Sequence, residues 1–451
     1  MGLLSIRLNY GLQDRPSKTI SLLAALQWVI FIISGNFVVP LIVGHVFGLS
    51  QGEIAMLTQR TIFLTGLASL LQVLFGHRLP LIEGVAGMWW GVFIILGATA
   101  SSLEKDPLII LTQLETGLII SGVVLLILGL TGVMQWLQQL FTPLITGTYL
   151  LLLSLQLSGP FLKGMLGIEG DGGMVDWKIA SLSLVLVILV LVLSLRGKSW
   201  LRSLTPLIGI MLGWGAFTLL GLDTEPHRQV LTSQTAFFSL PQPFSWGRPA
   251  WDLGIVFTSV LTGLILLSNL VASISAMEEA LGKSFPPGTY RWGGIFNGIA
   301  NIFTGIWSGI GMITLSISVG FIGLTGMAAR LPFIIACLLV ILVGLLPPVG
   351  SFFAKLPLSV AYAVTFASFS QMIGFGLKSL AMVELDQRNL TVFSLSLITG
   401  VGFMFIPPHF FTQLPSIVQY IFSNGLLLGI VLALILEHLA FPANRNKKTV
   451  R

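Results

Sequence analysis

Long apolar stretches follow one another along the whole chain and are separated by short polar intervals. A helix needs about 20 apolar residues to cross a bilayer, and about fourteen of these stretches approach or exceed that length. They lie near residues 21–43, 54–75, 81–100, 108–132, 143–162, 179–195, 204–222, 253–276, 291–307, 315–329, 331–349, 357–377, 390–406 and 416–440. The pattern predicts an all-α polytopic membrane protein.

A polar interval from Asp223 to Asp252 divides these runs into two sets of seven. An odd number of spans per set gives the two sets opposite orientations, which is the inverted-repeat arrangement of many transporters. The third run of the first set contains GVAGMWWG at 84–91, and the corresponding run of the second contains GMITLSISVG at 311–320. The sequence therefore predicts two inverted repeats of seven segments.

Both matching runs are interrupted by glycine, and the stretch 296–330 combines many glycines with serine and threonine. Broken backbone at membrane depth is tolerated only where protein or a polar cavity satisfies the freed N–H and C=O groups. Broken segments at matching positions in two halves point to a transport site. The alternative interpretation is that these glycines only allow helices to pack closely.

Composition supports a membrane protein. The chain is 55% hydrophobic and 9% charged, with a mean hydropathy of +0.95, whereas soluble proteins contain about 25% charged residues. The net charge of +6 therefore does not indicate nucleic-acid binding. With the N-terminus inside, most Lys and Arg fall on the cytoplasmic side. We expect a multi-pass plasma-membrane protein, such as one of the bacterial inner membrane, with both termini cytoplasmic and no cleaved signal peptide.

Motifs of enzymes and ATP-driven pumps are missing from the sequence. It contains neither G-x-x-x-x-G-K-[ST] nor H-E-x-x-H, and GFIGLTG at 320–326 lacks the soluble βαβ context of a dinucleotide site. The histidines fall in loops, at interfaces or at the end of the last run without metal-ligand spacing. The lone Cys337 is expected to be a small core residue. We expect a protein that is not an enzyme and has no cofactor and no metal.

Several motifs resemble one family of transporters. They are LLAALQWVIFIISGNFVVPLIVG (22–44), HRLPLIEGVAGMWWGVF (77–93), FTPLITGT (141–148), SVGFIGLTGMAAR (318–330) and DQRNLTVFSLSLITGVG (386–402). Together they resemble the nucleobase–ascorbate transporters, which include uracil, xanthine and uric acid permeases. The likeness extends from about residue 21 to residue 440.

The resemblance implies fourteen segments, a homodimer, and a core domain that moves against a gate domain. The expected boundaries are 1–20 for a cytoplasmic N-terminus, 21–132 and 253–349 for the core, 133–222 and 350–441 for the gate, 223–252 for an extracytoplasmic linker and 442–451 for a cytoplasmic tail. Segments 3 and 10 would each hold a short extended piece. This places Ala86–Met88 opposite Leu315–Ile317, beside the substrate.

The resemblance also implies the residues of the substrate site. They are Gln27, Gly35, Ala86, Gly87, Met88, Asn269, Ser273, Leu315, Ser316, Ile317 and Ser318. Several depart from the family pattern, since Asn269 stands where the family has a carboxylate and Ile317 where it has Glu, Gln or Pro. Trp28 and Ser273 replace histidines, and Ser318 replaces the signature Asn. An asparagine can pair with a base but cannot carry a proton.

Two other carboxylates are candidates for coupling transport to H+ or Na+, because an acidic residue inside a membrane implies function. Glu83 opens the broken third run, and Glu115 lies in the fourth. The alternatives are an interfacial Glu83 paired with a neighbour, and a packing Glu115 bonded to Gln113 or Thr112.

Three functions remain open. The first is a secondary transporter of a purine or pyrimidine base or a similar heterocycle, probed by uptake into liposomes. The second is an anion transporter of sulfate-permease-like architecture, although no Lys or Arg occupies the expected site. The third is a non-transporting sensor that kept the fold.

Overall fold

The computed structural model describes residues 8–102, 106–132, 140–168, 173–197, 204–222, 237–411 and 413–441. The expected tail at 442–451, residues 1–7 of the expected N-terminus and residues 223–236 of the expected linker lie outside the described residues. The structure is 75% helical. A mostly helical chain with many apolar helices agrees with the predicted class of polytopic membrane protein.

The elements follow the predicted apolar runs closely. In the first half they are α1 (Lys18–Asn36), α2 (Val38–Val46), α3 (Gln51–Leu74), β1 (Glu83–Val85), α4 (Gly87–Ser102), α5 (Pro107–Thr131), α7 (Pro143–Met165), α8 (Trp177–Arg196) and α10 (Thr205–Leu219). In the second half they are α11 (Leu253–Leu281), α12 (Pro287–Ile306), β2 (Met312–Thr314), α13 (Ile317–Thr325), α14 (Arg330–Gly344), α15 (Pro347–Phe353), α16 (Leu358–Leu380), α17 (Gln387–Met404), η1 (Pro408–Phe411), α18 (Ser416–Phe422), α19 (Gly425–Ile435) and η2 (Leu436–Ala440).

Among the described residues, 7 helices are long and apolar enough to cross a membrane, or up to 8 if the bent pair α14 and α15 forms one span. That pair bends by 84°. Other predicted runs hold shorter apolar helices, such as Thr205–Leu219 and Gly425–Ala440. The helices of the third and tenth predicted runs are short for a different reason, because a strand precedes each of them: β1 lies inside the third run, and β2 lies just before the tenth.

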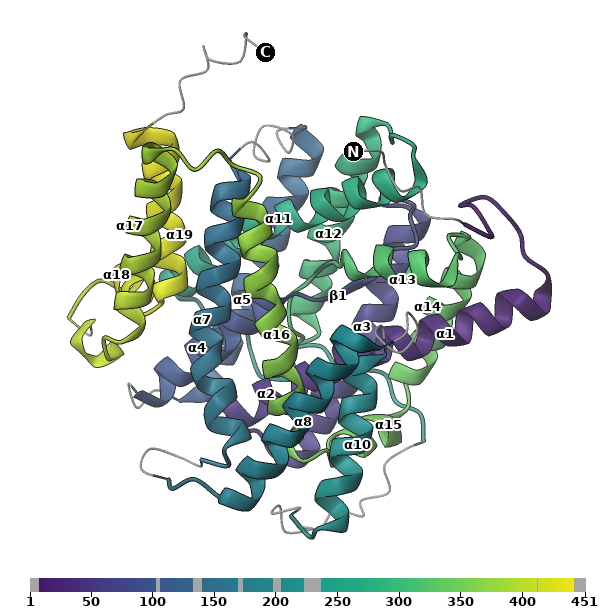
Figure 1. The fold of residues 1–451 in the computed structure, drawn as a ribbon, viewed down its shortest axis with the longest axis horizontal. Coiled ribbons are helices and arrows are strands. Elements are labelled where there is room, and N and C mark those ends of the chain that lie inside the picture. Colours follow the sequence, from purple (N-terminus) through teal and green to yellow (C-terminus); the bar gives the residue numbers. More distant parts are fainter. Residues whose placement is uncertain are drawn as a thin grey trace.

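Helices from the two halves of the chain pack against one another (Figure 1). Helix α12 lies against α5, α11 against α5, and α3 against α14, whereas α7 lies against α16 and α17 against α19. Helices α17, α18 and α19 gather at one end of the molecule, while α1, α13 and α14 lie at the opposite end.

Glycine explains the close crossing of α5 and α12. A Cβ on Gly298 of α12 would lie 2.6 Å from the backbone nitrogen of Leu126 in α5, and one on Gly122 would lie 2.6 Å from the Gly298 carbonyl oxygen. Helices that approach this closely need glycine at the contact. The close-packing interpretation is therefore correct for Gly298, whereas a Cβ on Gly320 would meet nothing within 4 Å.

Candidate substrate site

The two broken runs meet in a short antiparallel sheet. Strands β1 and β2 pair with Glu83 opposite Thr314, Gly84 opposite Ile313 and Val85 opposite Met312. The predicted register is therefore wrong, since Ala86–Met88 and Leu315–Ile317 do not face each other. Instead the Ala86 N–H donates to the Gly311 carbonyl at 3.1 Å, and the Leu315 N–H donates to the Ile82 carbonyl at 2.8 Å.

The physical reason for this register is where the helices begin. Residues from Gly87 and from Ile317 onward are already helical, so the extended backbone lies about three residues earlier than expected. Each strand thus leads into the N-terminus of a helix, where unpaired N–H groups and the helix dipole favour hydrogen-bond acceptors. Because the strands are antiparallel, these two N-termini lie at opposite ends of the sheet.

Side chains complete the edges of this sheet. In an antiparallel pair, alternate residues direct their backbone groups outward, and here Glu83, Val85, Met312 and Thr314 do so. The Glu83 N–H donates to Ser69 Oγ at 2.9 Å, and the Val85 N–H to Asn36 Oδ1 at 2.9 Å. These bonds satisfy backbone groups that lipid could not satisfy.

The edge of β2 is satisfied in the same way. The Asn301 side chain donates to the Met312 carbonyl at 3.0 Å and accepts from the Met312 N–H at 3.2 Å. The Ser273 hydroxyl donates to the Thr314 carbonyl at 3.0 Å, and its oxygen lies 2.8 Å from Ser316 Oγ. Since Ser273 has one proton and gives it to the carbonyl, Ser316 is the donor of the second bond.

An accessible face remains where β2 enters α13. Ser316 is exposed and Ile317 is 59% exposed, whereas Leu315 is half-buried. Asn269 on α11 is also half-buried, and its side chain makes no hydrogen bond to any part of the chain that the structure describes. On α1, Gly35 is exposed, with open space beside its Cα. These residues leave polar groups available to a ligand.

The other predicted site residues are buried in the protein interior or lie away from the accessible face. Ser318 is fully buried and its hydroxyl accepts from the Ile82 N–H at 3.0 Å. Ala86 and Met88 are also fully buried. Gly87 is half-buried, and a Cβ there would lie 3.7 Å from the Phe369 ring of α16. Gln27 is exposed and lies eight residues, or about 12 Å of helix, before Gly35.

The family's first-helix histidine position is occupied by an aromatic anchor. Trp28 is fully buried, and its ring centroid lies 4.5 Å from that of Phe321 in α13 and 4.9 Å from that of Phe333 in α14. The indole therefore holds α1 against both helices by packing rather than by hydrogen bonding to a ligand.

Glu83 is the centre of a buried polar cluster. Its side chain is fully buried, Oε1 accepts from the Thr314 hydroxyl, and Oε2 accepts from Asn297 Nδ2 at 3.1 Å. His77 Nε2 lies 3.7 Å from Oε1, and the His77 side chain is fully buried as well. Glu83 is therefore buried within the protein rather than an interfacial charge, and His77 lies in the loop between α3 and β1, as predicted, with its ring turned into the interior.

Glu115 occupies a different place. Its Oε1 accepts from the hydroxyl of Ser308 rather than from a group of Thr112 or Gln113. The guanidinium of Arg60 is buried and lies 5.9 Å from the centroid of the Trp246 ring. Arg60 is a positive charge near Glu115, although the two form no direct ion pair among the described residues.

Sequence reasoning missed Asn36, Asn297, Asn301, Ser69 and Phe369. A signal for the asparagines was available, since a polar amide inside an apolar run must find a partner, and Asn297 and Asn301 have the i, i+4 spacing of one helix face. Ser69 and Phe369 carry no comparable signal, because their importance depends on which distant segment lies beside them.

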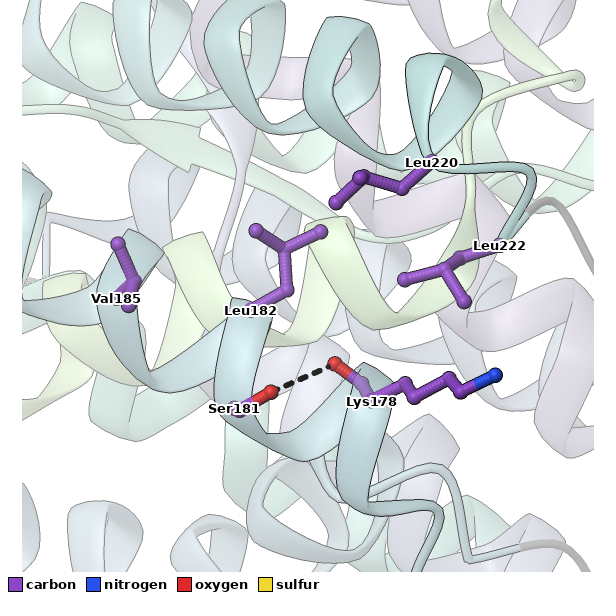
Figure 2. A pocket seen from close by; sticks show the side chains of 6 residues that line it. All are labelled: Lys178, Ser181, Leu182, Val185, Leu220 and Leu222. Atoms are coloured by element: carbon purple, nitrogen blue, oxygen red, sulfur yellow. Dashed lines mark hydrogen bonds between the residues drawn. The ribbon is translucent and has the colours of Figure 1, made fainter.

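A separate cavity of about 470 Å³ lies between α8 and the end of α10 (Figure 2). It is lined by Lys178, Ser181, Leu182, Val185, Leu220 and Leu222. The Ser181 hydroxyl donates to the Lys178 carbonyl at 3.0 Å. None of the predicted substrate-site residues lines this cavity.

Apolar helices, paired interrupted segments and an accessible polar face beside the break together define a multi-pass membrane transporter. The family model Xan_ur_permease, described as "Permease family", matches residues 19–409. The chain belongs to this permease family, and it is a transporter rather than an enzyme.

Relatives match along almost the whole length. The putative purine permease YwdJ of Bacillus subtilis is 33% identical over 433 residues, which cover 95% of this chain and 97% of that protein. The xanthine permease of the same organism is 25% identical over 436 residues, covering 96% and 95% of the two chains. The uric acid transporter UacT of Escherichia coli is 24% identical, covering 94% and 88%.

Solved structures share the fold at low identity. The transmembrane domain of the cyanobacterial bicarbonate transporter BicA has a TM-score of 0.58 at 14% identity, over 94% of this chain and 98% of that chain. SLC26A9 has a TM-score of 0.63 at 12% identity, over 92% and 64%. These likenesses concern the fold alone.

Proposed function

We propose that the protein is a secondary active permease of purine bases. The relatives named above are purine, xanthine and uric acid permeases. A planar base carries N–H donors and carbonyl acceptors at its edge, and the polar groups beside the break are of the kinds that pair with such an edge.

One observation carries this proposal: Asn269 and Ser316 present polar groups beside the sheet. The Asn269 amide has both a donor and an acceptor side, and it is half-buried without a hydrogen-bond partner in the described part of the chain. Ser316 stands exposed at the beginning of α13. A base held between them would also face the N–H groups at the start of α13, which favour its carbonyl oxygens.

The proposal includes the architecture expected from the sequence. Fourteen segments form two inverted repeats, and the group with the sheet (segments 1–4 and 8–11) moves as a core against a gate of segments 5–7 and 12–14. The protein is a homodimer in the bacterial inner membrane with both termini in the cytoplasm. Uptake is coupled to H+ or Na+, with Glu83 or Glu115 as the coupling group.

An anion transporter is the competing function, because BicA and SLC26A9 share the fold. Anion sites in proteins commonly use Arg or Lys. In the described residues, the side chains bonded to the outer edges of the two strands are hydroxyls and amides of Ser69, Asn36, Asn301, Asn297 and Ser273. The residues that we assign to the base site, Asn269 and Ser316, are likewise an amide and a hydroxyl. This absence of a cationic side chain at the assigned residues favours a base.

A thermal-shift panel tests the choice. Purified protein is heated with xanthine, uric acid, hypoxanthine, uracil, bicarbonate or sulfate. A ligand at 100 times its Kd stabilises the native state by about 2.7 kcal/mol, so purine bases are expected to raise the melting temperature and the anions are not. Asn269→Leu should abolish the shift without lowering the ligand-free melting temperature. Stabilisation by bicarbonate or sulfate alone would reject the proposal in favour of anion transport.

A further inference from the structure

The carboxylate of Glu83 has no permanent positive partner. Among the described residues it forms one ion-pair contact, with His77 at 3.7 Å. His77 Nδ1 accepts a hydrogen bond from the Leu79 N–H at 3.0 Å, so that nitrogen carries no proton. The ring in this arrangement is a neutral imidazole whose proton is on Nε2, on the side of Glu83.

Charged groups on the surrounding elements do not supply the missing charge. Arg60 lies nine residues before Ser69 on α3, about 13 Å along the helix, and is the neighbour of Glu115. Arg291 of α12 donates to the carbonyls of Gly129 and Leu130. Arg78 is exposed.

The remaining charged or titratable groups on these elements are also engaged elsewhere or distant. Glu53 forms the capping box at the start of α3 with Ser50, and Lys18 begins α1, at the end opposite Asn36. The Tyr290 hydroxyl of α12 is hydrogen-bonded to Ser275. Strand β2 contributes only the hydroxyl of Thr314.

A lone carboxylate buried inside a membrane protein is costly unless its charge is neutralised. Neutralisation by a metal cation would need free oxygen ligands, about six or more for a hard cation such as Ca²⁺. Here Thr314 Oγ1 already donates to Glu83 Oε1, and the Asn297 amide nitrogen donates to Oε2 and to the Met312 carbonyl. The surroundings therefore favour a proton.

We propose that Glu83, assisted by His77, is the proton-binding site that couples transport to the proton gradient. One proton binds the Glu83 carboxylate from the outside and leaves to the cytoplasm in each cycle. Protonated Glu83 can donate to Thr314 Oγ1, which reverses that bond because a hydroxyl both donates and accepts. The inference rests on the proposed function, since it concerns coupling to base uptake.

A continuous chain of contacts links this pair to the proposed base site. Glu83 contacts Thr314, the Thr314 carbonyl accepts from Ser273, and Ser273 contacts the exposed Ser316. A shift of Thr314 on proton binding would therefore alter the position of Ser316. This connection gives proton loading and base binding a common structural element.

Xanthine uptake into proteoliposomes tests the assignment. In the wild type, an inward proton gradient should drive xanthine above its external concentration, whereas a sodium gradient should not. Glu83→Gln should abolish accumulation, leaving simple equilibration, while xanthine counterflow, which needs no net proton movement, continues. Glu437→Gln is the matched control, because it removes another buried carboxylate, one that accepts from the Thr142 hydroxyl at 2.8 Å, and it should keep gradient-driven accumulation.

The outcomes separate the inference from the proposed function. Absence of xanthine counterflow in the wild type would defeat the function itself. Normal accumulation by Glu83→Gln, or accumulation driven by sodium, would overturn the proton site alone. Should Glu83→Gln fail to fold, His77→Gln gives a second test: it should move the external pH of half-maximal uptake, and an unchanged pH profile would overturn the proposal.

Discussion

Replacing Asn36 by alanine tests how the buried sheet is held. The Asn36 side chain is 2% exposed, its Oδ1 accepts from the Val85 N–H at 2.9 Å, and its Nδ2 donates to the Ile32 carbonyl at 2.8 Å. Asn36→Ala leaves the Val85 N–H without a partner, since water does not replace it at this depth.

The expected magnitude follows from this one unsatisfied donor. A buried donor that loses its acceptor costs about 1–3 kcal/mol. Each 1.4 kcal/mol is a factor of ten in an equilibrium, so local opening of β1 should become about 5- to 150-fold more frequent. The Ile32 carbonyl adds little to this cost, because helical carbonyls already have a backbone partner.

Amide hydrogen exchange measures the opening directly. The exchange rate of the peptide covering Leu81–Met88 should rise by this factor in Asn36→Ala, while peptides from α7 and α16 stay unchanged. Asn36→Asp keeps an acceptor oxygen for Val85 and is the matched control, with a smaller increase. Exchange at β1 as slow in Asn36→Ala as in the wild type would refute the view that side chains hold the sheet.

Two further predictions concern packing. Gly298→Val should lower the free energy of unfolding by about 1–3 kcal/mol through overpacking, because its Cβ would meet the Leu126 nitrogen at 2.6 Å. Gly320→Ala is the control, since a Cβ there meets open space, and equal melting temperatures of the two variants would contradict the helix contact. Trp28→Ala should lower the free energy of unfolding by about 3–5 kcal/mol, because Trp28 is fully buried. Trp292→Ala should lower it far less, since Trp292 is 50% exposed, and a calorimetric scan that gives similar losses for both would contradict the role of Trp28 in packing.

The helices were largely predictable because hydrophobic runs determine where helices form in a membrane protein. Each predicted run contains a helix, including the run near 81–100 that begins with β1. The register of the sheet was not predictable. The register depends on the residues at which α4 and α13 begin, Gly87 and Ile317. The periodicity of a sequence does not give such helix boundaries to within three residues.

The candidate site was predictable only in part. Ser273 and Ser316 were expected beside the break and do contact each other. Ser318 was expected to bind substrate, yet it holds Ile82 instead. Asn36, Asn301 and Ser69 satisfy strand edges from three different helices, and such pairings between distant segments cannot be deduced from the spacing in one sequence.

The role of Glu83 depends on contacts with residues that are distant in the sequence. Because Glu83 lies where a polar interval meets an apolar run, the sequence also allowed it to be an interfacial charge. The fold instead buries it between Thr314 and Asn297, which are more than 200 residues away in the sequence. Glu115, which looked similar in the sequence, lies near a buried arginine.

Counterflow of radiolabelled xanthine in proteoliposomes, comparing the wild type with Ser316→Trp, tests the central claim most directly. Ser316 is exposed at the start of α13, so an indole there should occupy the space of the base. The account predicts rapid exchange by the wild type and none by a Ser316→Trp protein that keeps its melting temperature. Exchange by Ser316→Trp at the wild-type rate would contradict a substrate site at the broken segments.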